Sequence, residues 1–241
     1  MFLNPAIILV RPQLGENIGK TARAMLNFGL TDLRLVAPRD GWPNPTAGPS
    51  ASGADVVLDA AHVYEDVASA IADCHTVFAT TVRGRDMPKP VATPAAAARM
   101  VSDNALNGYR SAFLFGREAA GLSNDEVSHA DTILTVPVNP DFGSLNLAQA
   151  VILIAYELFN VADETDSISP ADQGGFATKQ ESEDLLEHLA RELEDRGYFR
   201  SEGRRSNQMR MLRNLILNAT FSSQEIQTLR GVVKSLSRPK C

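Results

Sequence analysis

Residues 111–122 have the sequence SAFLFGREAAGL, in which an apolar run ends at Gly116 and a carboxylate follows at Glu118. A short apolar run of this kind predicts a buried strand. A glycine directly after such a strand lets a ligand approach the backbone closely. Glu118 is then expected at the carboxyl edge of a sheet, where it can orient a cation or a hydroxyl. A plain strand-to-helix turn is the alternative interpretation of this segment alone.

Segments of similar character alternate with helical segments over residues 1–160. Strands are predicted at residues 6–10, 32–37, 76–80, 111–115 and 132–136. Helices are predicted at residues 17–28, 52–61, 66–73, 94–101, 124–129 and 147–161, and the Pro- and Gly-rich residues 38–53 predict a loop. This alternation predicts an α/β fold, a doubly wound and mostly parallel sheet with helices on both faces. Ligands of such folds bind at the carboxyl ends of the strands, so a pocket is expected among the loops 80–85, 116–121 and 139–144.

The C-terminal part differs from the rest in composition and charge. Residues 163–177 resemble a linker, which divides the chain into an α/β domain at 1–162 and a small helical unit at 178–241. The whole chain has a net charge of −6, yet residues 196–241 contain ten Lys and Arg against two acidic residues. A basic end can bind a polyanion, or its basic face can dock on the acidic body of its own chain or a partner chain. Charge alone favours neither interpretation.

Several classes of protein are disfavoured by the sequence. The two cysteines, Cys74 and Cys241, suit a reduced, cytoplasmic protein. No apolar run approaches the length of a membrane span, and the four histidines are too dispersed for a metal site. Gly15 and Gly19 loosely suggest a phosphate-binding loop, but their spacing does not fit one.

Two further segments contain candidate functional residues. Residues 17–29, NIGKTARAMLNFG, predict a helix capped by Asn17, with Arg23 projecting from its body about 9 Å further along the axis. Residues 141–150, DFGSLNLAQA, begin a long apolar helix that Ser144 or Asn146 can cap. Considered singly, each segment is better explained as a capped helix than as a site.

In their order, the three segments resemble the three motifs of the SPOUT methyltransferases, and in particular the TrmH-type ribose methyltransferases. The resemblance covers residues 1–160. Residues 77–83 (VFATTVR) are similar to a further family loop, and the stretches RGYF, MLRNL and SSQEIQTLRGV of the C-terminal unit resemble the tail of bacterial members that methylate nucleotide 32 of the tRNA anticodon loop.

The resemblance implies a deep trefoil knot, a homodimer with sites built from both chains, and S-adenosylmethionine as methyl donor, with no metal. Donor contacts are implied for Thr80, Thr81, Val82, Gly116, Val136, Gly143, Ser144 and Leu145, although family members often have Ser where this chain has Gly143. Arg23 matches the arginine that activates the ribose hydroxyl, which it would polarise rather than deprotonate because a guanidinium stays protonated. Residues that would position this arginine and the ribose are Asn17, Glu118, Ser144 and Asn146.

A tRNA-binding role is implied for the basic tail, through phosphates and therefore in a salt-dependent way. The candidate residues are Arg200, Arg204, Arg205, Arg210 and Arg213. Alternatives are a ribosomal RNA substrate, another tRNA position, an RNA-binding relative without activity, or an ordinary nucleotide-binding α/β protein. The C-terminal unit argues against ribosomal RNA, the intact motif residues argue against lost activity, and the missing phosphate-loop motifs argue against the last.

Overall fold

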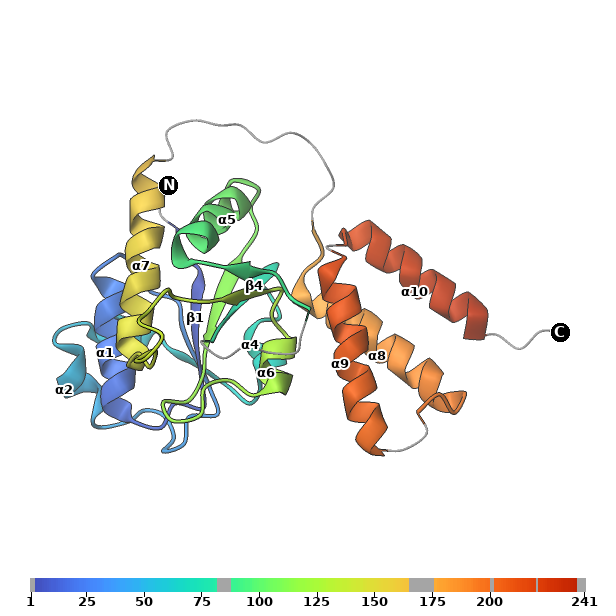
Figure 1. The fold of residues 1–241 in the computed structure, drawn as a ribbon, viewed down its shortest axis with the longest axis horizontal. Coiled ribbons are helices and arrows are strands. Elements are labelled where there is room, and N and C mark those ends of the chain that lie inside the picture. The colour runs from blue at the N-terminus through green and yellow to red at the C-terminus, as the bar shows by residue number, and fades with distance from the viewer. Residues whose placement is uncertain (1–2, 82–87, 165–175, 200–201, 220, 238–241) are drawn as a thin grey trace.

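The computed structural model describes residues 3–81, 88–164, 176–199, 202–219 and 221–237. Its strands form one parallel sheet in the order β3-β2-β1-β6-β4-β7-β5 (Figure 1). The strands are β1 (Ala6–Val10), β2 (Leu33–Val36), β3 (His62–Tyr64), β4 (Thr76–Thr80), β5 (Val91–Ala92), β6 (Ser111–Phe115) and β7 (Thr132–Leu134). From β1 the chain adds β2 and β3 on one side and then places β4 to β7 on the other side of β1. The sheet is therefore doubly wound, as predicted.

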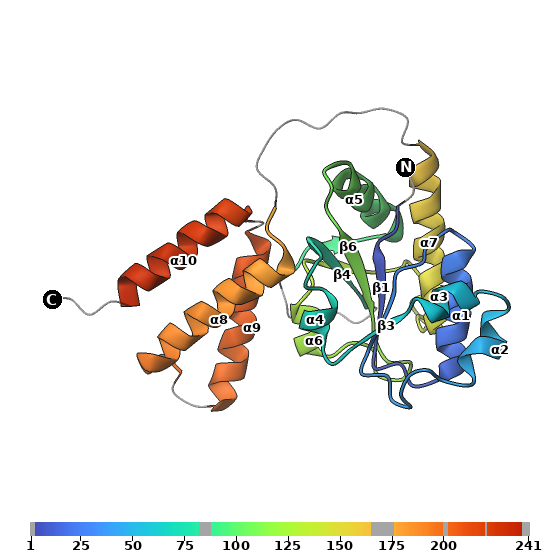
Figure 2. The ribbon, with the colours of Figure 1, turned by 180° about the vertical axis from the view of Figure 1, so that it is seen from behind.

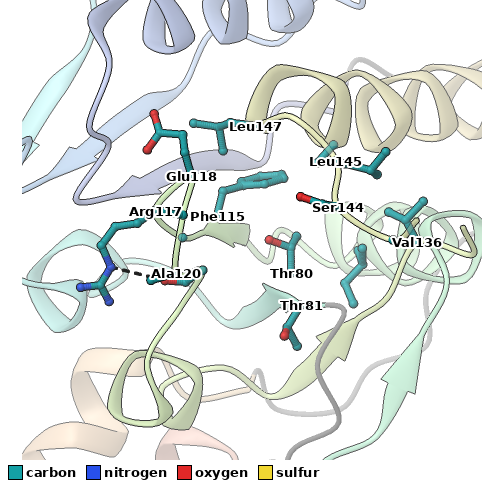
Figure 3. Close-up of a pocket in the computed structure, with 16 residues that line it drawn as sticks. Thr80, Thr81, Phe115, Arg117, Glu118, Ala120, Val136, Ser144, Leu145 and Leu147 are labelled. Carbon is teal, nitrogen blue, oxygen red and sulfur yellow. Dashed lines mark hydrogen bonds between the residues drawn. The ribbon is translucent and has the colours of Figure 1, made fainter. Parts of the chain in front are cut away.

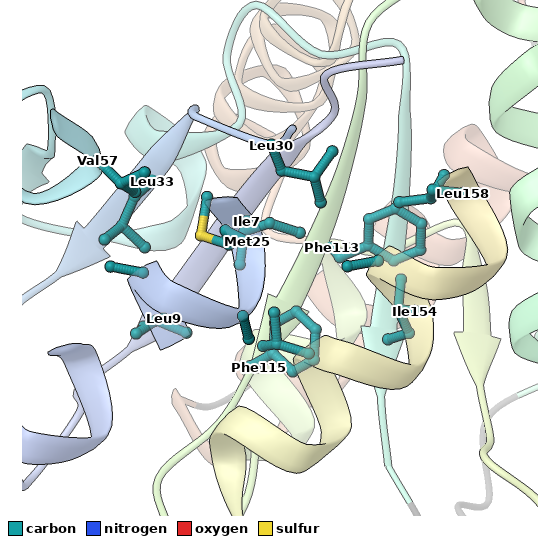
Figure 4. Packing of buried hydrophobic residues seen from close by; sticks show 14 of the residues in the cluster. Ile7, Leu9, Met25, Leu30, Leu33, Val57, Phe113, Phe115, Ile154 and Leu158 are labelled. Carbon is teal, nitrogen blue, oxygen red and sulfur yellow. The ribbon is translucent and has the colours of Figure 1, made fainter. Parts of the chain in front are cut away.

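Helices cover both faces of the sheet, and alternate residues of each strand supply the two cores. One face packs against α1 (Gly15–Leu26), α2 (Ala47–Ala51), α3 (Asp55–Asp59), α5 (Pro94–Leu106) and α7 (Leu147–Glu164). In this core Ile7 and Phe113 of neighbouring strands meet Met25 of α1 and Ile154 of α7, all fully buried (Figure 4). The opposite face packs against the short helices α4 (Val67–Ala70) and α6 (Asn124–Ser128).

The C-terminal unit consists of α8 (Lys179–Asp195), α9 (Glu202–Asn218) and α10 (Ser223–Ser237). These helices enclose a small core of their own around Leu185, Leu186, Ile216 and Ile226. Figures 1 and 2 show the unit as a separate body beside the sheet, on the side of α4 and α6. Most of the predicted linker, residues 165–175, lies outside the described residues.

Buried charges join the C-terminal unit to the domain. Lys179 of α8 forms an ion pair with Asp131, which precedes β7. Glu183 of α8 accepts two hydrogen bonds from Arg213 of α9 (2.8 and 3.1 Å) and lies 3.4 Å from the His129 ring nitrogen. Burial alone would raise the pKa of Glu183, but the hydrogen bonds with His129 and Arg213 outweigh it and hold that pKa at about 2.

Three local predictions were wrong. The helix predicted from Asn17 begins at Gly15, so Asn17 lies inside the first turn and does not cap it. The predicted loop 38–53 contains α2, which packs closely on α1: a Cβ at Gly19 would lie 2.0 Å from the Ala47 carbonyl oxygen. The short strands β3 and β5 were missed, since two or three residues show no clear period.

Among the described helices, none combines the length and apolar character that crossing a membrane requires.

Candidate functional site

A pocket opens at the carboxyl edge of the sheet, where the neighbouring strands β6, β4 and β7 end. We call it the edge pocket, and its cavity measures about 180 Å³. Its walls come from the ends of these strands, from the loop 116–121 after β6, and from the segment that leads into α7. Figure 3 shows side chains from these separate segments gathered around the same space. The pocket therefore lies where the sequence predicted it, although each segment alone was ambiguous.

Most residues implied to bind the methyl donor line the edge pocket. They are Thr80, Thr81, Gly116, Val136, Gly143, Ser144 and Leu145. Val82 lies outside the described residues. The apolar part of the lining comes from Phe115, Leu134, Val136, Leu145 and Leu147. Hydroxyl groups of two threonines and a serine stand among them, so the pocket combines an apolar wall with a few polar groups, as small-molecule sites do.

Gly116 has a steric reason to be glycine. A Cβ at this position would lie 2.2 Å from the Gly121 carbonyl carbon and from the Leu122 amide nitrogen. The chain folds back on itself here, because the Gly121 amide donates to the Arg117 carbonyl (2.8 Å) and Gly121 has a left-handed φ of +68°. Gly116 and Gly121 therefore set the floor of the edge pocket, and the turn holds Glu118 at its rim.

The side chains of the three sequence motifs meet at this rim. The Glu118 carboxylate accepts hydrogen bonds from the amides of Gln13 and Leu14 and from the Asn17 side chain (3.0 Å). Asn17, whose residue exposure is only 4%, in turn accepts a hydrogen bond from the Asn146 side chain (3.2 Å). We call Glu118, Asn17 and Asn146 the amide–carboxylate cluster. It ties α1, the turn after β6 and the start of α7 together.

Asn146 also fixes the start of α7. Its side-chain oxygen accepts a hydrogen bond from the Ala148 amide (3.0 Å), and its backbone amide donates to the Gln149 side-chain oxygen (3.1 Å). Of the two residues considered as caps, Asn146 therefore caps the helix. Ser144 lies before the helix and lines the edge pocket instead.

Arg23 stands apart from these residues within one chain. It is exposed on α1 and donates to the Ser52 hydroxyl (3.2 Å). Arg23 is not among the described residues that line the edge pocket. Six residues along a helix correspond to a rotation of about 240°, which explains why Arg23 and Asn17 project in different directions.

The candidate RNA-binding arginines differ in their surroundings. Arg210 pairs with Asp125 of α6 (2.8 Å), Arg205 with Glu194 of α8 (3.3 Å) and Arg213 with Glu183. Arg204 is exposed near the start of α9. Arg200 lies outside the described residues. Three of these arginines therefore pair with acidic side chains of the same chain. This is one of the two interpretations that the charge of the basic tail left open.

Arg11 and Arg117 at the carboxyl edge were not among the sequence candidates. Arg117 lines the edge pocket, and its guanidinium contacts the buried Glu126 (3.0 Å), which Arg11 approaches to 3.8 Å. The available signal was positional: both arginines closely follow apolar runs that predict strands.

Comparison with known proteins agrees with this geometry. Residues 4–156 match the model of the SpoU rRNA Methylase family. The chain belongs to this family. It is 34% identical to the tRNA (cytidine/uridine-2'-O-)-methyltransferase TrmJ of Citrobacter koseri, over 99% of this chain and 98% of the relative. It is also 35% identical to the tRNA (cytidine/uridine/adenosine-2'-O-)-methyltransferase TrmJ of Pseudomonas aeruginosa, over 94% and 91% of the two chains.

Solved structures extend the likeness to the C-terminal unit. The crystal structure of TrmJ from Z. mobilis is 54% identical, with a TM-score of 0.89 over 97% of this chain and 99% of that one. The family match ends before the helical unit, whereas these full-length matches include it. The residues that line the edge pocket fall within the family match, and the Z. mobilis structure shares the fold over the helical unit as well.

Proposed function

We propose that this chain transfers a methyl group from S-adenosylmethionine to the 2′-hydroxyl of a ribose in tRNA. The observation that supports this most is the amide–carboxylate cluster beside the edge pocket, which joins residues of three separate motifs. The full-length relatives named as tRNA 2'-O-methyltransferases support tRNA as the substrate. Nucleotide 32 of the anticodon loop is the proposed position, and a tRNA substrate agrees with the cytoplasmic location that the cysteine content predicts.

The edge pocket suits the proposed methyl donor. Its apolar wall can contact an adenine ring, while Thr80, Thr81 and Ser144 offer hydroxyl groups to polar parts of the ligand. The lack of side chains at Gly116 and Gly143 leaves backbone accessible at the two loops, and a Cβ at Gly143 would already contact Val138 (3.5 Å). When bound, S-adenosylmethionine supplies an electrophilic methyl group on a sulfonium.

The protein's own residues then have separate roles. The amide–carboxylate cluster fixes the loop that bears Glu118 relative to α1 and α7, and so orients the ribose against the edge pocket. Correct orientation of two reacting groups can contribute about 7–11 kcal/mol to a rate enhancement. Arg23 would polarise the 2′-hydroxyl and lower its pKa, and the proton would pass to solvent.

A homodimer would bring Arg23 into the site. Within one chain Arg23 faces Ser52, away from the amide–carboxylate cluster, so Arg23 of a second copy is the one proposed to act. The exposed face of α7 supports this arrangement. It presents a contiguous apolar surface of Ile152 (36% exposed), Leu153 (39%), Tyr156 (50%) and Phe159 (45%). Apolar patches of this kind mark protein interfaces. The trefoil knot is part of the same proposal.

The proposal is tested by incubating the protein with labelled S-adenosylmethionine and either bulk tRNA or ribosomal RNA. Label in tRNA is expected, and Arg23→Ala should lose turnover while still binding the cofactor product S-adenosylhomocysteine. Label in ribosomal RNA alone would show that ribosomal RNA, and not tRNA, is the substrate. Label in neither RNA would favour an RNA-binding protein without activity, and near-wild-type turnover of Arg23→Ala would refute its role.

A further inference from the structure

Two arginines flank the edge pocket and have no role in the chemistry proposed above. Arg11 directly follows β1, and Arg117 is the second residue after β6. Strands β1 and β6 are hydrogen-bonded neighbours in parallel register. The two arginines therefore lie on adjacent segments at the same carboxyl edge.

Both guanidinium groups converge on the carboxylate of Glu126. Arg117 donates to it at 3.0 and 3.3 Å, and the Arg11 Nε lies 3.8 Å from it. Glu126 also accepts the Ser123 amide (2.6 Å) as part of the capping box of α6. One carboxylate thus faces two guanidinium groups and an amide, which leaves an excess positive charge at this point.

Arg11 is the more available of the two. Its side chain is 59% exposed, against 22% for Arg117. Within the described part of the chain it makes no side-chain hydrogen bond, so its donors remain open to a ligand. Its backbone is left-handed (φ +51°), held by the bond from its amide to the Val36 carbonyl (2.8 Å). Such backbone is uncommon outside glycine and is concentrated at functional sites.

Helix α6 connects this pair of arginines to the C-terminal unit. Asp125, next to Glu126, pairs with Arg210 of α9 (2.8 Å), and the Arg210 side chain is 31% exposed. The adjacent carboxylates of α6 thus contact arginines from the segments after β1 and β6 and from α9. In Figures 1 and 2, α6 lies between the sheet and α9.

We propose that the RNA passes over α6 from the edge pocket to α9, and that Arg11, Arg117 and Arg210 bind its backbone phosphates on the way. This inference rests on the proposed function and adds the route of the substrate. Guanidinium groups suit phosphate oxygens because their planar array of donors matches them. The carboxylates of α6 would then serve to orient the arginines before RNA binds. The carboxylate of the methyl donor is the other anion that could meet Arg117.

The test uses the full-length protein with Arg11→Met, Arg117→Met and, as a matched control, Arg99→Met on the exposed surface of α5. Affinity for bulk tRNA is measured over a series of salt concentrations, and affinity for S-adenosylhomocysteine is measured by calorimetry. Each of the first two variants should bind tRNA about 3- to 10-fold more weakly and reduce the slope of log K against log salt by about 0.7–1. The Arg99→Met control should match the wild type in both assays, and Arg11→Met should bind S-adenosylhomocysteine as the wild type does.

Other outcomes would overturn the inference. Weaker binding of S-adenosylhomocysteine with unchanged tRNA binding would assign the arginines to the methyl donor. Unchanged binding of both tRNA and S-adenosylhomocysteine would mean that the two arginines only stabilise α6. Because Arg117→Met removes a partner of buried Glu126, Arg117→Lys and the thermal midpoint of each variant separate misfolding from lost contacts. Failure of the wild type to methylate tRNA would refute the proposed function, whereas methylation with unaffected variants would refute only the route.

Discussion

Replacing Asn17 by Ala tests whether the amide–carboxylate cluster holds the site together. The substitution removes the donor to Glu118 and the acceptor for Asn146 at a buried position. A hydrogen bond to a charged group contributes about 1.5–3 kcal/mol and a neutral one about 0.5–1.5 kcal/mol, so the free energy of unfolding should fall by about 2–4 kcal/mol. For a chain of this size that corresponds to a thermal midpoint lower by roughly 5–15 °C.

Activity should fall further than stability alone explains. At a temperature where the variant is fully folded, turnover with tRNA should drop about 10- to 100-fold, because small displacements of reacting groups have effects of that size. Asn4→Ala is the matched control. The Asn4 side chain makes three hydrogen bonds before β1 at the opposite edge: it donates to the Thr31 hydroxyl (3.1 Å) and accepts from the amides of Thr31 (2.9 Å) and Asp32 (3.4 Å). Wild-type turnover of Asn17→Ala, or an equal loss in Asn4→Ala, would refute the reasoning.

Three further predictions concern stability and assembly. The pKa of Glu183 is lowered to about 2 from an ordinary 4.5, so its carboxylate contributes on the order of 3 kcal/mol to the free energy of unfolding. This contribution is complete above pH 4.5 and is lost as the pH falls towards 2. Urea unfolding of Glu183→Gln should lack this pH dependence. Gly19→Ala should lower the free energy of unfolding by about 1–3 kcal/mol or more, because its Cβ meets the Ala47 carbonyl, and an unchanged unfolding midpoint would contradict the close packing of α1 on α2. Tyr156→Asp should convert the proposed dimer into a monomer in light scattering and abolish turnover, while Val63→Asp, at an exposed position of β3, should leave the dimer intact; a monomeric wild type would refute the dimer.

The central strands could be predicted from the sequence because their apolar runs are long enough to stand out. The bounds of β1, β4 and β6 agree with the prediction. Helix α2 was missed because its sequence, AGPSA, has the composition of a loop, and only its packing against Gly19 reveals why it is ordered there. The glycines that loosely suggested a phosphate loop instead allow the segment around Ala47 to approach α1.

The candidate site could be located but not arranged from the sequence. The alternation of strands and helices along the chain predicted which loops form the edge pocket. Hydrogen bonds between residues more than a hundred positions apart, such as Asn17 to Glu118 and Asn146 to Asn17, leave no local pattern. The tail arginines show the same difference: their number predicted a basic surface, but only the structure shows that Arg213 faces Glu183 rather than solvent. Their contact with RNA, and the trefoil knot, remain predictions.

The most direct test of the central proposal is mass spectrometry of nuclease fragments, and of the nucleosides within them, from tRNA that lacked 2′-O-methyl groups before incubation with the protein and S-adenosylmethionine. The proposal predicts 2′-O-methylcytidine or 2′-O-methyluridine in the anticodon-loop fragment that contains nucleotide 32, and none with the Arg23→Ala variant. A methyl group found on a base rather than on a ribose, or no methyl group in tRNA at all, would contradict it.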